Sequence, residues 1–336
     1  MRGADLDPER KRVEEEFGPW TAHSIQLGAD SYTFEPWFDT RLRRVVQAAA
    51  DILGKSFGSL RVLDLACLEG QLGIEFALQG AEVTAIEGRK ANLAKAQFAK
   101  EALGLDRLSL ELGDVRDLSL DRHGAFDVVV CAGILYHLDA PDSMDLIQSI
   151  ADVCRGIAIV DTHISLSETS ACEWRGRTYH GSYRQEHSDS ATAEEVEGAL
   201  WHSIDNRRVF LLTRDSLCNL LRHAGFTSVF ECLVPYEAYF SDWPSDTGSL
   251  VELPDRVMLV AVRGEPRPLK SSEWADGLPW IDRPERSQVL GRPGIFERIG
   301  RRADRAMRKL SGAGRGKQSQ SGLLSGKARP LWVKRS

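Results

Sequence analysis

The chain has 336 residues, 42% of them hydrophobic, and a formal net charge of −6 at pH 7. This length is enough for one large α/β domain with additional segments, and the longest apolar run, residues 128–136, is far shorter than the ~20 residues of a membrane-spanning helix. Residues 298–336 hold 12 basic residues and one acid, so they carry +11 and the remainder −17. An acidic body disfavours a catalytic domain that wraps around nucleic acid.

Residues 1–44 are expected to form an N-terminal arm or cap over the active site. Their charged start lacks the apolar core of a signal peptide, and the six cysteines occur singly without metal-ligand spacing, so we expect a reduced, cytoplasmic chain. The aromatic and histidine side chains of the arm either cover the site or pack as ordinary core, and both interpretations stay open. The arm residues that are candidates for substrate contact are Trp20, His23 and Tyr32.

Two apolar segments that each end near an acid organise the region that follows. Residues 62–66 read as a buried strand that contains Asp64, and the amphipathic segment after Gly70 reads as a helix with free N–H groups at its start. Residues 81–88 read as the next strand, with Glu87 at its end. A carboxylate there can accept hydrogen bonds from both hydroxyls of a ribose. Open α/β sheets bind nucleotide-like ligands at this edge.

The sequence VLDLACLEG at residues 62–70 resembles the first motif of the class I S-adenosylmethionine-dependent methyltransferases, strand-Asp-Leu-Gly-Cys-Gly-x-Gly. The resemblance covers residues 45–263. It implies an α/β fold with a Rossmann-like, seven-stranded sheet, mostly parallel with a terminal antiparallel strand, and S-adenosyl-L-methionine as cofactor. Ala66 and Leu68 replace two glycines of the family motif, so we expect the loop to take another course.

The resemblance also implies which residues hold the cofactor. Asp114 follows the third strand, at the position whose carboxylate receives the adenine amine in the family, and the N–H of Val115 meets a ring nitrogen. The end of the fourth strand, residues 131–137, is expected to border the methyl-donor pocket. The expected cofactor residues are Asp64, Ala66, Gly70, Glu87, Gly88, Asp114, Val115, Ala132 and Gly133.

A long insertion follows the fifth strand, which ends at His163. Residues 164–212 far exceed an ordinary connection, and their aromatic and titratable side chains are typical of a lid over a polar substrate. The alternative is that most of these polar groups are solvated and that the aromatic residues form the insertion's own core. The candidates for substrate contact here are Glu173, Trp174 and Tyr179.

Methyl transfer to a hydroxyl requires removal of its proton, and a histidine that titrates near neutrality is the usual base. His163 is the first choice, with His180 and His137 as the other catalytic candidates. His137 has a structural alternative, since it could bond backbone beneath the cofactor. No tight ligand pair for a metal is apparent, so we expect no metal site. The residue types that would suit one are His163, Glu168, His180, Glu186 and His187.

The remaining elements complete the sheet and lead into a basic tail. A helix at residues 214–223 precedes strands at 227–234 and 256–263, which form the terminal antiparallel hairpin. Beyond them we expect an irregular arm at 264–293, a basic amphipathic helix at 294–310 and a disordered tail at 311–336. The tail is expected to contact an acidic partner or a membrane surface, or the helix packs on the acidic body.

The expected function is methyl transfer to an oxygen of a small-molecule acceptor, such as a natural-product, sugar or lipid-linked precursor. A lead-in around Trp20 and Tyr32 resembles a branch that contains both small-molecule O-methyltransferases and wobble-uridine tRNA-modifying enzymes, so a tRNA methyl or carboxymethyl transferase stays an alternative. A further alternative is a non-catalytic scaffold that has kept the fold, which is suggested by Leu68 at a glycine position of the family motif. A NAD-dependent oxidoreductase is disfavoured because the Gly-x-Gly-x-x-Gly run is absent.

Overall fold

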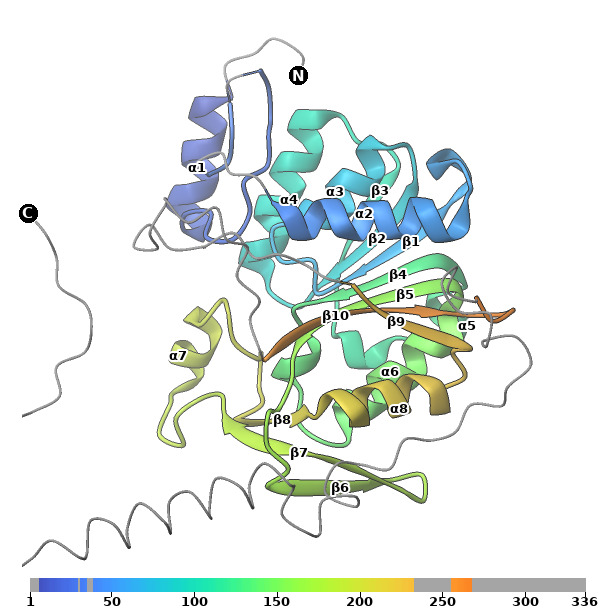
Figure 1. Cartoon of the computed structure of the whole chain (residues 1–336). Helices are drawn as coiled ribbons and strands as arrows, with labels where there is room; N and C mark the ends of the chain where they lie inside the picture. The colour runs from blue at the N-terminus through green and yellow to red at the C-terminus, as the bar shows by residue number, and fades with distance from the viewer. Residues whose placement is uncertain (1–5, 30, 35–38, 233–254, 268–336) are drawn as a thin grey trace, which may run out of the picture. The chain divides into compact units, whose positions relative to one another are not determined.

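The computed structural model describes residues 6–29, 31–34, 39–232 and 255–267. Its centre is a seven-stranded sheet in the order β3-β2-β1-β4-β5-β10-β9, accompanied by a smaller sheet in the order β6-β7-β8 (Figure 1). The large sheet consists of β1 (Arg61–Leu65), β2 (Glu82–Glu87), β3 (Leu108–Leu112), β4 (Phe126–Ala132), β5 (Cys154–His163), β9 (Ser228–Cys232) and β10 (Arg256–Val262). The small sheet consists of β6 (Ser170–Trp174), β7 (Arg177–Gln185) and β8 (Arg208–Leu212).

Helices cover both faces of the large sheet. The α-helices are α1 (Asp7–Phe17), α2 (Thr40–Leu53), α3 (Gln71–Leu78), α4 (Lys90–Leu103), α5 (Leu120–His123), α6 (Asp142–Val153), α7 (Ala193–Gly198) and α8 (Arg214–His223). Short 3₁₀ turns are η1 (Phe57–Ser59), η2 (Val115–Asp117) and η3 (Leu135–His137). In Figure 1, α2, α3 and α4 lie on one side of the sheet and α6 and α8 on the other. No helix among the described residues is long and apolar enough to cross a membrane.

The alternation of side chains along each strand explains the two layers of core. Val62 of β1 packs with residues of α2, α3 and α4, whereas Leu63 and Leu65 pack with residues of α6 and α8. Successive side chains of a strand point to opposite faces, and both faces of a parallel sheet are buried in this class of fold. The apolar strands therefore fill both layers and leave the chemistry to the residues at their carboxyl ends.

The end of the sheet confirms the expected hairpin. β10 pairs antiparallel with β5, and β9 pairs antiparallel with β10, while β1 to β5 pair in parallel. The helix before the first strand ends at Gly54, which follows α2 in the left-handed conformation at φ +59°, and glycine adopts this conformation without steric cost. The α8 helix begins at a cap in which Thr213 accepts a hydrogen bond from the N–H of Ser216.

The insertion at residues 164–212 is more regular than a lid of loops. It forms the small sheet and α7, and Tyr179 and Phe210 join the core that α6 and α8 share. The N–H of Phe210 also donates to the carbonyl of Leu138, 3.0 Å away. The region 268–293, the helix expected at 294–310 and the tail at 311–336 lie outside the described residues.

Candidate active site

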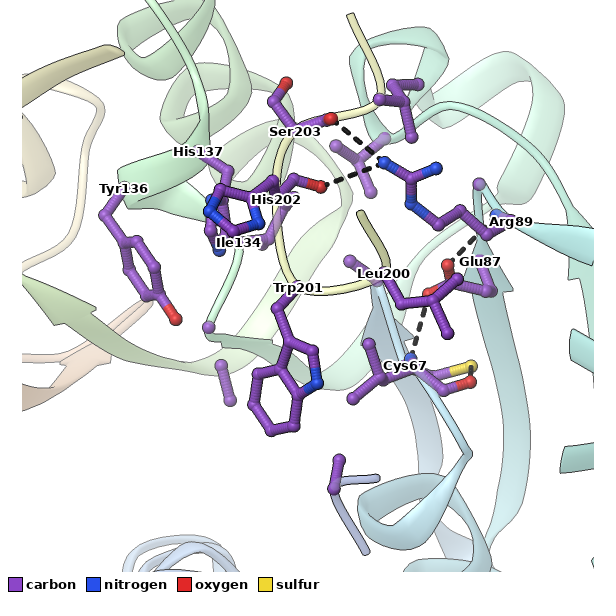
Figure 2. A pocket seen from close by; sticks show the side chains of 18 of the residues that line it. Cys67, Glu87, Arg89, Ile134, Tyr136, His137, Leu200, Trp201, His202 and Ser203 are labelled. Carbon is purple, nitrogen blue, oxygen red and sulfur yellow. Dashed lines mark hydrogen bonds between the residues drawn. The ribbon is translucent and has the colours of Figure 1, made fainter. Parts of the chain in front are cut away.

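A cavity of about 700 Å³ opens at the carboxyl ends of β1, β2 and β4. This volume lies in the range of small-molecule sites. Figure 2 shows part of its lining, to which the strand ends and the insertion both contribute. The expected cofactor residues that line it are Asp64, Ala66, Glu87, Gly88, Asp114, Val115, Ala132 and Gly133. Gly70 lies next to the lining, at the start of α3.

The loop after β1 has backbone angles that are typical of glycine, although two of its positions carry other residues. Ala66 and Leu68 have φ angles of +51° and +53°, and Gly70 has +88°. A residue with a Cβ is disfavoured in this left-handed region, yet both non-glycine residues adopt it. The expected change of course is therefore not observed. Leu68 instead presents its side chain to the cavity.

Glu87 joins this loop to the end of β2. Its carboxylate accepts the N–H of Leu68 at 2.9 Å, the N–H of Arg89 at 3.0 Å and the side-chain amide of Asn92 at 3.3 Å. Burial raises the pKa of Glu87, and these hydrogen bonds oppose the rise. Since a carboxylate has about four acceptor positions, Glu87 can still accept a hydrogen bond from a ligand in the cavity.

Asp64 anchors the helix that follows the loop. Its carboxylate is 1% exposed and accepts the N–H of Gly73 in α3 at 2.8 Å. Burial raises the pKa of Asp64 to about 7, the hydrogen bond from Gly73 opposes this, and the nearby charge of Glu87 adds to it. The acid that the motif places at the end of β1 therefore holds the loop and α3 together.

Asp114 has a strong internal partner that the sequence did not indicate. The guanidinium of Arg116 donates to both oxygens of Asp114, and it also reaches Asp142 at 3.3 Å and Asp205 of the insertion at 2.6 Å. Burial would raise the pKa of Asp114, but the hydrogen bonds and charge of Arg116 lower it overall. The residue expected to receive an adenine amine is thus already tied to the insertion.

A segment of the insertion, residues 200–205, lines the same cavity. Arg89, only 2% exposed, holds it in place: its guanidinium donates to the carbonyls of Glu197 at 2.7 Å, Val196 at 3.0 Å and Ser203 at 3.0 Å. Figure 2 shows the hydrogen bond to Ser203. Arg89 and Arg116 were both missed by sequence reasoning. A signal for Arg89 was present in the sequence, because this basic residue stands directly after Glu87 and Gly88, at the start of a helix. The N-terminus of a helix does not favour a cation, so a cation there indicates another partner.

Glu69 attaches the N-terminal arm to the motif loop. Its fully buried carboxylate accepts backbone N–H groups of Thr21 at 2.8 Å, Ala22 at 3.0 Å and His23 at 2.9 Å. The ammonium of Lys95, equally buried, lies 3.6 Å from the same carboxylate and donates to a backbone carbonyl of the arm. This cluster brings the arm to the edge of the cavity.

Of the three arm candidates, only His23 lines the cavity. Burial, with a contribution from Arg41, lowers the pKa of His23 to about 3, so its ring is neutral. Its Nδ1 is buried without a hydrogen-bond partner among the described residues. Trp20 packs against Phe98 in the core, and Tyr32 pairs with the backbone of the arm itself.

Two of the three candidate catalytic histidines line the cavity. Nδ1 of His137 is hydrogen-bonded to the carboxylate of Glu186. His163 contacts Asp255 through Nδ1 at 3.2 Å and Arg256 through Nε2 at 3.4 Å. The Tyr136 ring lies beside both imidazoles, with centroid distances of 4.2 Å to His137 and 4.8 Å to His163.

The other candidates of the insertion lie away from the cavity. His180 of β7 does not line the cavity, and its backbone N–H donates to the hydroxyl of Ser216 in α8. Trp174 donates its indole N–H to Asp145, and the Tyr179 hydroxyl bonds His223 at 2.8 Å. Glu173 is exposed and bonds Thr178 of the neighbouring strand. These two aromatic residues therefore attach the insertion to the core that α6 and α8 share.

Metal ligands are not assembled either. Among the described residues, no group of three or more His, Cys, Asp or Glu side chains is arranged to hold a metal ion. Glu186 instead accepts a hydrogen bond from His137, and Nε2 of His187 donates to the backbone carbonyl of Ser203, 2.7 Å away.

Comparison with known proteins adds an independent observation. Residues 62–156 match the sequence model of a family described as a methyltransferase domain. The ubiquinone biosynthesis O-methyltransferase of Chromobacterium violaceum is 37% identical over 95 residues, which are 28% of this chain and 38% of that protein. The corresponding protein of Pseudomonas syringae pv. tomato is 35% identical over 115 residues, 33% of this chain and 46% of that one. The chain thus spans less than half the length of these relatives.

Solved structures agree with the fold. The N-terminal domain of EvdMO1, crystallised in the presence of SAH and D-fucose, superposes with a TM-score of 0.58 at 23% identity, and the match covers 78% of this chain and 98% of that domain. The same domain with SAH bound gives a TM-score of 0.56 at 24% identity over 79% of this chain. Residues 62–156 therefore match a methyltransferase domain in sequence, and the seven-stranded sheet has the fold of these solved structures.

Proposed function

We propose that the chain transfers a methyl group from S-adenosylmethionine to a hydroxyl oxygen of a small-molecule acceptor. The observation that carries the proposal is the single cavity that unites the motif loop, the Glu87 carboxylate and two histidines. The curated relatives are named as O-methyltransferases, and the EvdMO1 domain was crystallised with a sugar present. Both support an oxygen acceptor.

The cavity's donors and acceptors fit such a cofactor. Glu87 would accept a hydrogen bond from a ribose hydroxyl, and Asp114 with the N–H of Val115 would face the adenine. Gly88 lines the cavity directly after Glu87, so no side chain separates its backbone from a ligand. The unpartnered Nδ1 of His23 offers a further buried polar atom beside the loop. When bound, the sulfonium supplies a methyl group that is already activated, so the protein's main task is alignment.

The acceptor side of the cavity is polar and aromatic. Tyr136, His137, His163 and Arg256 line it, and these groups can orient a hydroxylated compound and take up its proton. The segment 200–205 closes the cofactor side, so we propose that the insertion at 164–212 acts as a lid and contributes to substrate choice. Its attachment to Arg89 and Arg116 supports this role.

Calorimetric titration with S-adenosylmethionine and S-adenosylhomocysteine tests the cofactor assignment. We expect micromolar dissociation constants, and Glu87→Ala should weaken binding by roughly 1–3 kcal/mol. Glu82→Ala, at the exposed start of the same strand, is the matched control and should bind normally. A folded chain that binds neither compound would end the proposal.

The oxygen acceptor is tested by incubating the chain with radiolabelled S-adenosylmethionine and a panel that contains catechol, protocatechuate and D-fucose. Label in an ether product supports the proposal, whereas label found only on nitrogen, carbon or tRNA would replace the acceptor class while keeping the cofactor.

A further inference from the structure

We propose that Glu186 is a positioning residue that fixes His137 as the base for the acceptor hydroxyl, and that the same carboxylate couples this base to the segment over the cofactor. The inference rests on the proposed methyl transfer and deepens it. Glu186 follows directly after β7 and lies in sequence 49 residues from His137, so the insertion supplies a part of the site that the methyltransferase sheet lacks.

The Glu186 carboxylate is buried and almost fully engaged. Its side chain is 2% exposed. Oε1 accepts from Nδ1 of His137 and from the N–H of Ser203 at 2.9 Å, and Oε2 faces Arg184 at 3.4 Å. Burial would raise the pKa of Glu186, but the hydrogen bond and charge of His137, followed by the contacts with Ser203 and Arg184, bring it to about 2. The group is therefore an anion at any working pH.

An anion at Nδ1 decides what the other ring nitrogen can do. A carboxylate accepts and does not donate, so Nδ1 of His137 carries the hydrogen and Nε2 of the neutral ring carries the lone pair. Nε2 has no hydrogen-bond partner among the described residues, and His137 lines the cavity with 13% of its side chain exposed. This nitrogen is placed to accept a proton from a ligand.

The resulting step balances. The acceptor oxygen forms a bond to the methyl carbon while the carbon–sulfur bond breaks and its electron pair stays on sulfur. The hydroxyl proton passes to Nε2 of His137, and the imidazolium so formed is stabilised by the Glu186 carboxylate. No further reactant is required.

His163 is less suited to this task. Both of its ring nitrogens are engaged, Nδ1 by Asp255 and Nε2 by the guanidinium of Arg256. Burial and then the charge of Arg256 lower the pKa of His163, so a proton arriving there would be opposed by a neighbouring cation. The arrangement around His163 favours contact with the substrate over proton transfer.

The peptide at Ser203 connects the base to the cofactor cover. Its N–H donates to Glu186, and its carbonyl accepts from Arg89 at 3.0 Å and contacts His187 at 2.7 Å. Asn206, three residues on, donates to the backbone carbonyl of His137 at 3.2 Å. Displacement of residues 200–206 would therefore remove the contact of Ser203 with Glu186 and the contact of Asn206 with His137, so the base is aligned when the cofactor is covered.

Long-range ¹H–¹⁵N spectra of ¹⁵N-histidine-labelled protein test the positioning role without an acceptor. The resonances of His137 are assigned from their absence in His137→Gln. We expect the Nδ1–H tautomer of the neutral ring, and in Glu186→Gln a mixture of both tautomers, since an amide can donate as well as accept. Glu194→Gln, the same change at an exposed position of α7, should leave the tautomer unchanged. An Nε2–H tautomer in the unaltered chain, or a tautomer unaffected by Glu186→Gln, would overturn the inference.

Kinetics with the best acceptor of the panel test the catalytic consequence. Glu186→Gln should lower kcat roughly 10- to 100-fold with KM within threefold, and His137→Gln should lower kcat roughly 10²- to 10⁴-fold. Unchanged kcat in either variant would contradict the assignment.

Binding of S-adenosylhomocysteine separates this inference from the proposed function. Glu186→Gln keeps an acceptor for the Ser203 N–H and should bind within threefold of the unaltered chain, whereas Glu186→Ala should bind several-fold more weakly. Equal binding by both variants would remove the coupling. No binding by the unaltered chain would defeat the proposed function, while the tautomer spectra would still decide the role of Glu186.

Discussion

The loop after β1 is held in a conformation that its residues disfavour. Ala66 and Leu68 both lie in the left-handed region, at a cost of about 1–2 kcal/mol for each residue with a Cβ. Neighbouring contacts have to impose this conformation, and the hydrogen bond from the Leu68 N–H to Glu87 is one of them. The strain is thus located where the proposed cofactor meets the backbone.

Substitutions at Leu68 can measure that cost. Ala usually stabilises a chain relative to Gly because Gly has more conformational freedom when unfolded. At Leu68 we expect the reverse order: both Leu68→Gly and Leu68→Ala remove the side chain, but only Gly relieves the left-handed strain. Leu68→Gly should be more stable than Leu68→Ala by about 1 kcal/mol in urea unfolding. Equal stability, or a more stable Ala variant, would argue against the φ angle described for this residue.

The buried carboxyl of Asp64 predicts a pH dependence. The pKa of Asp64 is about 7 in the fold and 3.8 for an ordinary aspartate, so the folded state binds the proton more tightly. The contribution of Asp64 to the free energy of unfolding is therefore fully present below pH 4 and is lost as the pH rises through 7. With 1.36 kcal/mol per pKa unit, the loss is on the order of 4 kcal/mol.

Asp64→Asn keeps an acceptor for the Gly73 N–H and removes the titration. Without ligand, the free energy of unfolding of this variant should exceed that of the unaltered chain at pH 8 and approach it at pH 4. Asp106→Asn, at an exposed position, provides the comparison and should show no such trend. A constant difference between Asp64→Asn and the unaltered chain across this range would contradict the shifted pKa.

At the level of elements, the arm depends on one buried ion pair. Glu69 and Lys95 are fully buried and tie residues 19–23 to α4 and the motif loop. Removing one partner of such a pair leaves an uncompensated charge and typically costs 3–5 kcal/mol. The position of the arm beside the cavity therefore rests on charges that no segment of the arm itself supplies.

Lys95→Met should destabilise the chain by roughly 3 kcal/mol in urea unfolding, and Glu69→Gln combined with Lys95→Met should cost less than the two single changes added together, because the pair is coupled. Lys90→Met, an exposed change on the same helix, is expected to have an effect below ~0.5 kcal/mol. Additive single and double variants would mean that the ion pair is not energetically coupled.

The elements differ in how far the sequence predicts them. Local signals in the sequence mark the apolar strands and the acids at the ends of β1 and β2, and the predicted sheet is confirmed. Glycines are a local signal of the same kind where α2 and α4 end. The insertion has no such signal, because Trp174 and Tyr179 read equally well as a lid or as core. Their packing partners lie on α6 and α8, far away in sequence.

The same reason explains what was missed in the site. The bond between His137 and Glu186, and the reach of Arg116 to Asp205, join residues separated by 49 and 89 positions. Which titratable residue of the insertion meets which strand end depends on the register of β7 and β8, and composition does not specify that register. The candidates of the insertion, Glu173, Trp174, Tyr179 and His180, therefore lie away from the cavity, and residues 200–205 line it instead.

At the scale of the whole molecule, the described strands of the sheet and the described lining of the cavity all precede the basic tail. The residues that line the cavity run from Thr21 to Arg256, and the last described contact of the body joins the N–H of Arg267 to the hydroxyl of Ser228 at 2.8 Å. The net charge also differs between the two parts of the chain: residues 298–336 carry +11, and the rest carries −17. The cofactor site and the basic tail are thus separable in sequence.

A chain that ends at Arg267 should consequently keep the cofactor site. We expect its dissociation constant for S-adenosylhomocysteine to stay within threefold of that of the whole chain, since it retains all of the cavity lining that the structure describes. Because the tail's charge is removed, only the whole chain should bind anionic lipid vesicles, with an affinity that falls as salt is added. A full-length variant in which the basic residues after Arg298 are changed to Gln separates charge from length and should behave like the truncated chain. A tenfold weaker affinity for S-adenosylhomocysteine in a truncated chain that still folds would instead assign the tail a part in the site.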